Sequence, residues 1–133
     1  MKAQNSNKGV YLTPQVQFKL KEIACRYHIT LKSLVPALLW YISTNEKETL
    51  FNSSALVGAR KLKHVDISNK VFDNLKIQAC QHHLPLSHYI NIALLDVFDE
   101  PYMDDTDEWI VKCFYMDIIE KYHETLDLAR QCG

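Results

Sequence analysis

Glycine and proline are scarce in this 133-residue chain, which holds 3 of the first and 4 of the second. This scarcity excludes collagen-like and low-complexity chains and favours an ordered, helix-rich protein. The sequence has no apolar run near the ~20 residues that a membrane-spanning helix needs. Its first residues also lack the apolar core of a secretory signal peptide. We therefore expect a cytoplasmic protein with no membrane partner.

Motifs that would indicate an enzyme are missing as well. The sequence has no glycine-rich phosphate loop and no nucleophile elbow. It also has no pair of carboxylates set near a histidine at a spacing that suggests catalysis. These absences predict a protein that is not an enzyme and that carries no cofactor.

The cysteines are widely spaced, at Cys25, Cys80, Cys113 and Cys132. In a reducing compartment we expect them to be free thiols. Cys25-x-x-His28 and Cys80-x-x-His83 offer four ligands, which is the number that tetrahedral zinc takes. The simpler interpretation is a small thiol on the inner face of a helix and a histidine that closes the helix. We predict no metal site.

Charge is distributed unevenly, although the net charge is only −1. Residues 1–70 hold 11 Lys and Arg against 4 Asp and Glu, whereas residues 71–133 hold 4 against 12. The imbalance is either a chance drift or the sign of two opposed surfaces. The second interpretation predicts a basic surface that faces a polyanion and a separate acidic one.

An internal repeat organises the chain, because residues 8–43 match residues 63–98 at a constant offset of 55 without a gap. Apolar positions and the two hydroxyl residues Thr13 and Ser68 stay in step. The identical pairs include Val10 and Val65, Val16 and Val71, Leu20 and Leu75, Ala24 and Ala79, and His28 and His83. We interpret the match as a duplication.

Each copy predicts the same order of elements. A short alternating stretch, at 10–12 and 65–67, indicates a β-strand. Thr13 and Ser68 then cap a helix with an apolar stripe at helical spacing. This helix should end near His28 and His83 in the left-handed backbone conformation.

A second helix follows in each copy after a tight turn. Thr30 or Ser33 is the expected cap in the first copy, where Pro36 removes one hydrogen bond and should bend the helix. The second copy has Asn91 in place of Pro36, and Pro85 displaces the hydroxyl cap. The side chains expected to face the core are Leu34, Val35, Leu38, Leu39, Ile42, Ile90, Ala93, Leu94, Val97 and Phe98.

These patterns divide the chain into two repeated units at 7–43 and 62–98, a linker at 44–61, and an acidic amphipathic helix at 104–131. Acidic residues 104–108 suit the start of that helix. We expect its apolar stripe to pack on the units as an extra layer. The alternative is a protein partner, as in an antitoxin or a homodimer. The stripe comprises Trp109, Ile110, Cys113, Phe114, Ile118, Tyr122, Leu126 and Ala129.

Strand, immediate cap, helix, tight turn and second helix in one short unit resemble the ribbon-helix-helix family of Arc- and MetJ-like repressors. The resemblance is carried by residues 10–14 with 28–33, and by 65–68 with 83–88. Two units in tandem are similar to accessory proteins of conjugative plasmids. The resemblance implies a mainly α fold, in which the units form an intramolecular pseudo-dimer with one two-stranded antiparallel ribbon, plus a C-terminal helix.

For function, the resemblance implies binding of double-stranded DNA, with the ribbon in the major groove, where base edges can be distinguished. Alternation places Gly9, Tyr11, His64 and Asp66 on the outer face, where the family reads bases. Tyr11 and Asp66 depart from the Arg, Lys, Asn, Gln or Thr that is usual there. The carboxylate of Asp66 is unfavourable near phosphates unless it accepts a hydrogen bond from cytosine.

The family also holds phosphates at the start of the second helix, through backbone N–H groups and small polar side chains. Further contacts are expected from basic residues at the ends of the ribbon. The candidate phosphate-binding residues are Lys8, Thr30, Lys32, Ser33, Arg60, Lys61, Lys63, Ser87 and His88. We expect sequence-specific DNA binding by a transcriptional repressor, or by an accessory factor in plasmid or viral DNA handling.

Overall fold

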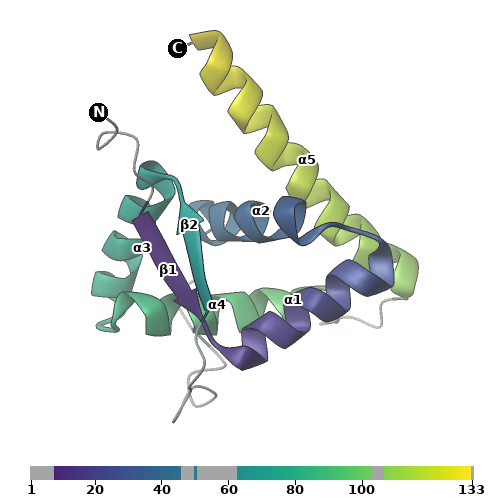
Figure 1. The fold of residues 1–133 in the computed structure, drawn as a ribbon, viewed down its shortest axis with the longest axis horizontal. Coiled ribbons are helices and arrows are strands. Elements are labelled where there is room, and N and C mark those ends of the chain that lie inside the picture. The colour runs from purple at the N-terminus through teal and green to yellow at the C-terminus, as the bar shows by residue number, and fades with distance from the viewer. Residues whose placement is uncertain (1–7, 46–49, 51–62, 103–106, 133) are drawn as a thin grey trace.

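A computed structural model describes residues 8–45, 50, 63–102 and 107–132. The first unit comprises β1 (Lys8–Leu12), α1 (Pro14–Tyr27) and α2 (Leu31–Thr44). The second comprises β2 (Lys63–Ile67), α3 (Asn69–Gln81) and α4 (Leu86–Asp99), followed by the 3-10 turn η2 (Glu100–Tyr102) and by α5 (Glu108–Cys132). Figure 1 shows this arrangement, with the ribbon on the side away from the start of α5. The expected mainly α fold with one two-stranded antiparallel sheet is confirmed.

The strands pair in a register that follows the sequence repeat. Val10 faces Val65 at the centre of the ribbon, and these two residues are equivalent at the offset of 55. Lys8 faces Ile67 and Leu12 faces Lys63 at its ends. Each strand has five residues, two more than the alternation predicted. The two units are therefore related by a pseudo-twofold axis that passes between the two valines.

The predicted caps form at both first helices. The Thr13 hydroxyl accepts from the Val16 amide at 3.3 Å, and the Ser68 hydroxyl does the same for Val71 at 3.3 Å. Each capping residue has an extended backbone, and its hydroxyl accepts from a first-turn amide that has no carbonyl partner within the helix. His28 and His83 both adopt a φ of 57°, as expected from the turn that follows each first helix.

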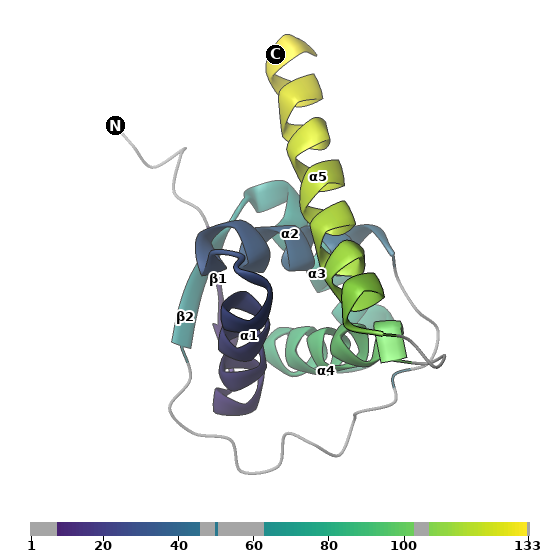
Figure 2. The same ribbon diagram turned by 90° about the vertical axis from the view of Figure 1, so that its right-hand side faces the viewer.

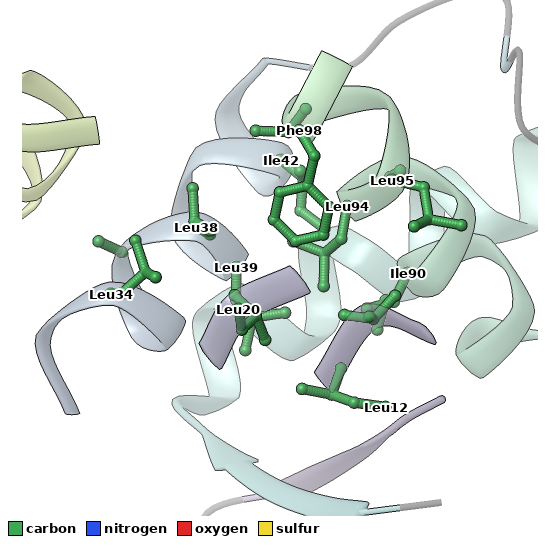
Figure 3. Packing of buried hydrophobic residues seen from close by; sticks show 14 of the residues in the cluster. Leu12, Leu20, Leu34, Leu38, Leu39, Ile42, Ile90, Leu94, Leu95 and Phe98 are labelled. Carbon is green, nitrogen blue, oxygen red and sulfur yellow. The ribbon is translucent and has the colours of Figure 1, made fainter. Parts of the chain in front are cut away.

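One hydrophobic core is shared by both units. Leu12 of β1, side chains of α1 and the inner faces of α2 and α4 meet in a single cluster, which Figure 3 shows from close by. Of the ten residues expected to face the core from α2 and α4, nine are buried, and Val35 is partly buried. The α4 helix is covered on every side, because β1, α1, α2, α3 and η2 all contact it.

A buried amide joins three of these helices. Gln78 of α3 donates to the Ser43 carbonyl of α2 at 2.8 Å, and its oxygen accepts from the Tyr89 hydroxyl of α4 at 2.7 Å. Gln78 is 6% exposed, so water cannot easily replace either contact. The network therefore fixes the second unit's helices against the first unit's α2.

The long helix α5 packs on α2 with part of the predicted stripe, because Ile118 is buried and Phe114 and Tyr122 are partly buried against the core. Val111, Tyr115, Ile118 and Ile119 are its buried residues. Trp109, Ile110 and Cys113 were expected on the inner face and are instead exposed. Its second half extends beyond the other helices in Figures 1 and 2. Although α5 is the longest described helix, neither it nor any other helix of the described ranges is apolar enough over sufficient length to cross a membrane.

Polar contacts anchor the start of α5. The Asp107 carboxylate caps it by accepting from the Ile110 amide at 3.0 Å. Glu108 accepts from Arg26 at 2.9 Å and from the Tyr27 hydroxyl at 3.2 Å, which links α5 to the end of α1.

A separate contact holds the turn η2 against α2. The Tyr41 hydroxyl donates to Glu100 at 3.0 Å. Burial and the neighbouring Glu100 raise the pKa of Tyr41 to about 12, so the hydroxyl keeps its proton. The turn that follows α4 is therefore held against α2.

The shared core generates a prediction about the isolated first unit. A fragment of residues 1–60 loses the partner of β1 and the cover of α2, so it should be unfolded or should dimerise. Circular dichroism and sedimentation velocity measure these properties. A fragment that is both folded and strictly monomeric would contradict the pairing of the two units.

Candidate nucleic-acid interface

The outer face of the ribbon carries the four residues that alternation selected. Tyr11 and His64 face each other across the strands, as do Gly9 and Asp66. Tyr11, His64 and Asp66 are exposed, while Val10 between them is 1% exposed on the inner side. The ribbon therefore presents one compact polar and aromatic surface and buries the other.

His64 occupies the centre of this surface. Its ring meets Tyr11 edge to face, with centroids 5.1 Å apart, and its Nδ1 lies 3.5 Å from a carboxylate oxygen of Asp66. The ring also covers Gly9, where an added Cβ would lie 1.7 Å from Nε2. Glycine at position 9 thus gives the imidazole room to lie across β1. The carboxylate of Asp66 is exposed to solvent beside this imidazole.

The start of α2 is the better-formed of the two expected phosphate sites. Thr30 caps the helix, and its hydroxyl accepts from the Ser33 amide at 3.2 Å and donates to the Ser33 hydroxyl at 3.0 Å. Lys32 is exposed in the first turn. Lys63 and Lys21 line the same small pocket as Leu31, the first residue of α2. Lys21 was not among the candidates predicted from the sequence, although it matches Lys76 in the repeat.

The start of α4 differs from that of α2. Pro85 occupies the cap position and supplies no side-chain hydrogen bond, as expected. Ser87 and His88 follow in the first turn, half-buried, and the Ser87 carbonyl accepts from Asn91 at 2.7 Å. The predicted contacts of Arg60 and Lys61 lie outside the described residues. The backbone of Lys8 begins β1.

Two side-chain amides that sequence reasoning passed over hold the end of β1. Asn91 of α4 accepts from the Thr13 amide at 2.8 Å and donates to the Tyr11 carbonyl at 2.8 Å. Gln17 of α1 donates to the Leu12 carbonyl at 2.7 Å. Asn91 is 2% exposed. The signals in the sequence were two mismatches in the repeat, Asn91 with Pro36 and Gln17 with Phe72.

The cysteine and histidine pairs lie on the surface. Cys25 and Cys80 are exposed free thiols, so the expectation that they face inward is wrong. Each lies on the outer side of its helix, because the inner positions are taken by Ile23 and Tyr27 in α1 and by Gln78 and Ala79 in α3. Over the described ranges, no group of three or more His, Cys, Asp or Glu side chains could hold a metal ion.

The close approach of His64 to Gly9 can be tested by substitution. Gly9→Ala should displace the imidazole and separate it from Asp66, since only a mobile ring stands in the way. Stability should stay equal or rise by up to ~1 kcal/mol, because alanine loses less backbone entropy on folding. Thermal unfolding and the NMR shifts of the His64 ring measure both effects. A loss above ~1 kcal/mol would mean that the ring is fixed in place.

Comparison with known proteins identifies no relative, so the fold is assigned from the geometry of the structure alone. No family model matches the sequence, and neither characterised proteins nor solved structures give a significant match. The described chain contains two strand-helix-helix units whose strands pair antiparallel. This architecture is consistent with a tandem ribbon-helix-helix fold.

Proposed function

We propose that this protein binds double-stranded DNA without catalysing a reaction. The outer face of the ribbon enters the major groove, and the starts of α2 and α4 approach the flanking phosphates. The observation that carries the proposal is the paired ribbon itself, with Tyr11 and His64 exposed over a buried inner face. A two-stranded ribbon fits the major groove, where base pairs differ in their donors and acceptors.

The distribution of charge supports this orientation. Lys21 and Lys63 are exposed beside one pocket at an end of the ribbon, and Lys32 is exposed next to Leu31, which lines the same pocket. The helix α5, which carries more acidic than basic residues, lies away from the ribbon in Figure 2. The charge of Asp66 opposes phosphate binding unless its carboxylate accepts a hydrogen bond from a cytosine. We assign the protein to repression of transcription or to plasmid or viral DNA handling in the cytoplasm.

Direct readout and phosphate contacts can be separated experimentally. Lys32→Ala should weaken binding to all duplexes about equally and lower the salt slope by about one unit, because a phosphate carries no sequence information. Tyr11→Ala should change which sequences are preferred and leave the salt slope unchanged. Fluorescence anisotropy with several duplexes over a range of salt concentrations measures both. Unchanged affinity and preference in both variants would contradict the proposed surface.

A second candidate function is self-association through α5. Trp109, Cys113 and Met116 share one face of its first half, and Trp109 and Met116 are 68% and 46% exposed. Exposed aromatic and methionine side chains on one face are typical of protein interfaces. A second copy that covers this face would join two DNA-binding ribbons in one homodimer.

Paired substitutions test this candidate. Replacing Trp109 and Met116 together by serine should convert a dimer to a monomer and leave the unfolding temperature of the monomer unchanged, because both side chains are exposed. Leu128→Ser is the matched control, since Leu128 is exposed but lies away from that face. Sedimentation equilibrium measures the outcome. A wild-type protein that stays monomeric at high concentration would exclude self-association.

A further inference from the structure

The pseudo-twofold axis relates the two strand ends, but the contacts at these ends differ. The turn from β1 into α1 is held by Asn91 and Gln17, which bond three consecutive backbone positions, the Tyr11 and Leu12 carbonyls and the Thr13 amide. Two of these bonds come from α4 and one from α1. Because Asn91 is buried, its contacts are shielded from competing water.

The equivalent positions in the other copy cannot make these bonds. Pro36 of α2 stands where Asn91 stands in α4, and Phe72 of α3 stands where Gln17 stands in α1. Proline and phenylalanine side chains have neither a hydrogen-bond donor nor a conventional acceptor. The turn from β2 into α3, around Ser68, therefore lacks the amide clamp that holds the turn at Thr13.

Packing under the two strands is also unequal, and β1 is again the more closely held strand. Val10 and Val65 are equivalent and face each other, yet Val10 is 1% exposed while Val65 is only partly buried. β1 packs against α4 and contacts α3. A pocket of about 40 Å³ remains beside Val65, bordered by Leu31 and Val35 of α2. β2 is thus seated less closely on α2 than β1 is on α4.

We infer that the two strands take unequal parts in DNA recognition, so that the ligand is a duplex site with one stringent and one tolerant half. This inference rests on the proposed function. Asn91 and Gln17 are positioning residues that hold the backbone of Tyr11 in one place. Discrimination between bases requires a side chain held within a fraction of an ångström. Within the described ranges, no side-chain amide supports the strand that carries His64 and Asp66 in this way, so this strand adapts to different base pairs.

Selection of duplexes from a random pool by the full chain tests the shape of the site. The expected motif has strong base preferences in one half and weak ones in the other. A palindromic motif with equally strong halves would overturn the inference while supporting DNA binding. Failure to enrich any sequence would reject sequence-specific binding, and the inference would fall with it.

Hydrogen exchange of the free protein tests the clamp without DNA. The Thr13 amide, bonded to Asn91, should exchange more slowly than the equivalent Ser68 amide, by on the order of tenfold or more. Equal exchange at the two amides would overturn the inference even if DNA binding were established. Slow exchange at Thr13 together with no enriched duplex would mean that the clamp exists but that the proposed function is wrong, and the inference would fall for that reason.

Substitution links the clamp to recognition. Gln17→Leu should reduce discrimination in the stringent half on the order of tenfold, with little change in affinity for random duplex. Phe72→Leu is the matched control at the equivalent position of the other copy, and should leave the motif unchanged. Gln17 is only partly buried, so the Gln17→Leu variant is expected to fold. Asn91→Ala is not used, because it would leave an empty buried site and is expected to prevent folding. A Gln17→Leu motif identical to that of the wild type would overturn the inference.

Discussion

The pairing of β1 with β2 is the constraint on which the rest of the structure depends. A single five-residue strand has an unpaired edge on both sides and cannot persist alone in water. Val10 against Val65 joins strands from different units, so neither unit is complete without the other. The same pairing directs Leu12 and Ile67 into a common core and turns Tyr11 and His64 outward. Fold and candidate site thus arise from one register.

Most of the architecture could be predicted, because the repeat supplied two independent copies of each local signal. Thr13 and Ser68 are caps in both copies, and His28 and His83 both adopt positive φ. Alternation then fixed which strand residues face outward, since a shift of one residue would expose Val10. These features depend on residues close in sequence. The role of the outer face in DNA binding remains a prediction.

Features that depend on distant contacts could not be predicted. The hydrogen bond from the Thr13 amide to Asn91 joins residues 78 positions apart, and no local sequence pattern predicts it. The buried face of α5 was predicted only in part, because its first half is apolar on nearly every side, including Trp109, Val111 and Tyr115. Periodicity cannot select the buried face of such a helix, which is decided by the surface of α2. The all-round burial of α4 has the same origin.

The pairing of distant strands also means that β1 must wait for β2 while the chain is being synthesised. Val10 is translated 55 residues before its partner Val65, so β1 has no strand to pair with while the intervening segment is made. At about 5–20 residues per second, this delay lasts roughly 3–11 s. During that time the apolar faces of α1 and α2 lack their cover and the strand edge is open to another nascent chain. Two chains made by neighbouring ribosomes on one messenger RNA can therefore pair the first unit of one with the second unit of the other. Such a domain-swapped dimer contains the same pairs of Val10 with Val65 as the single chain.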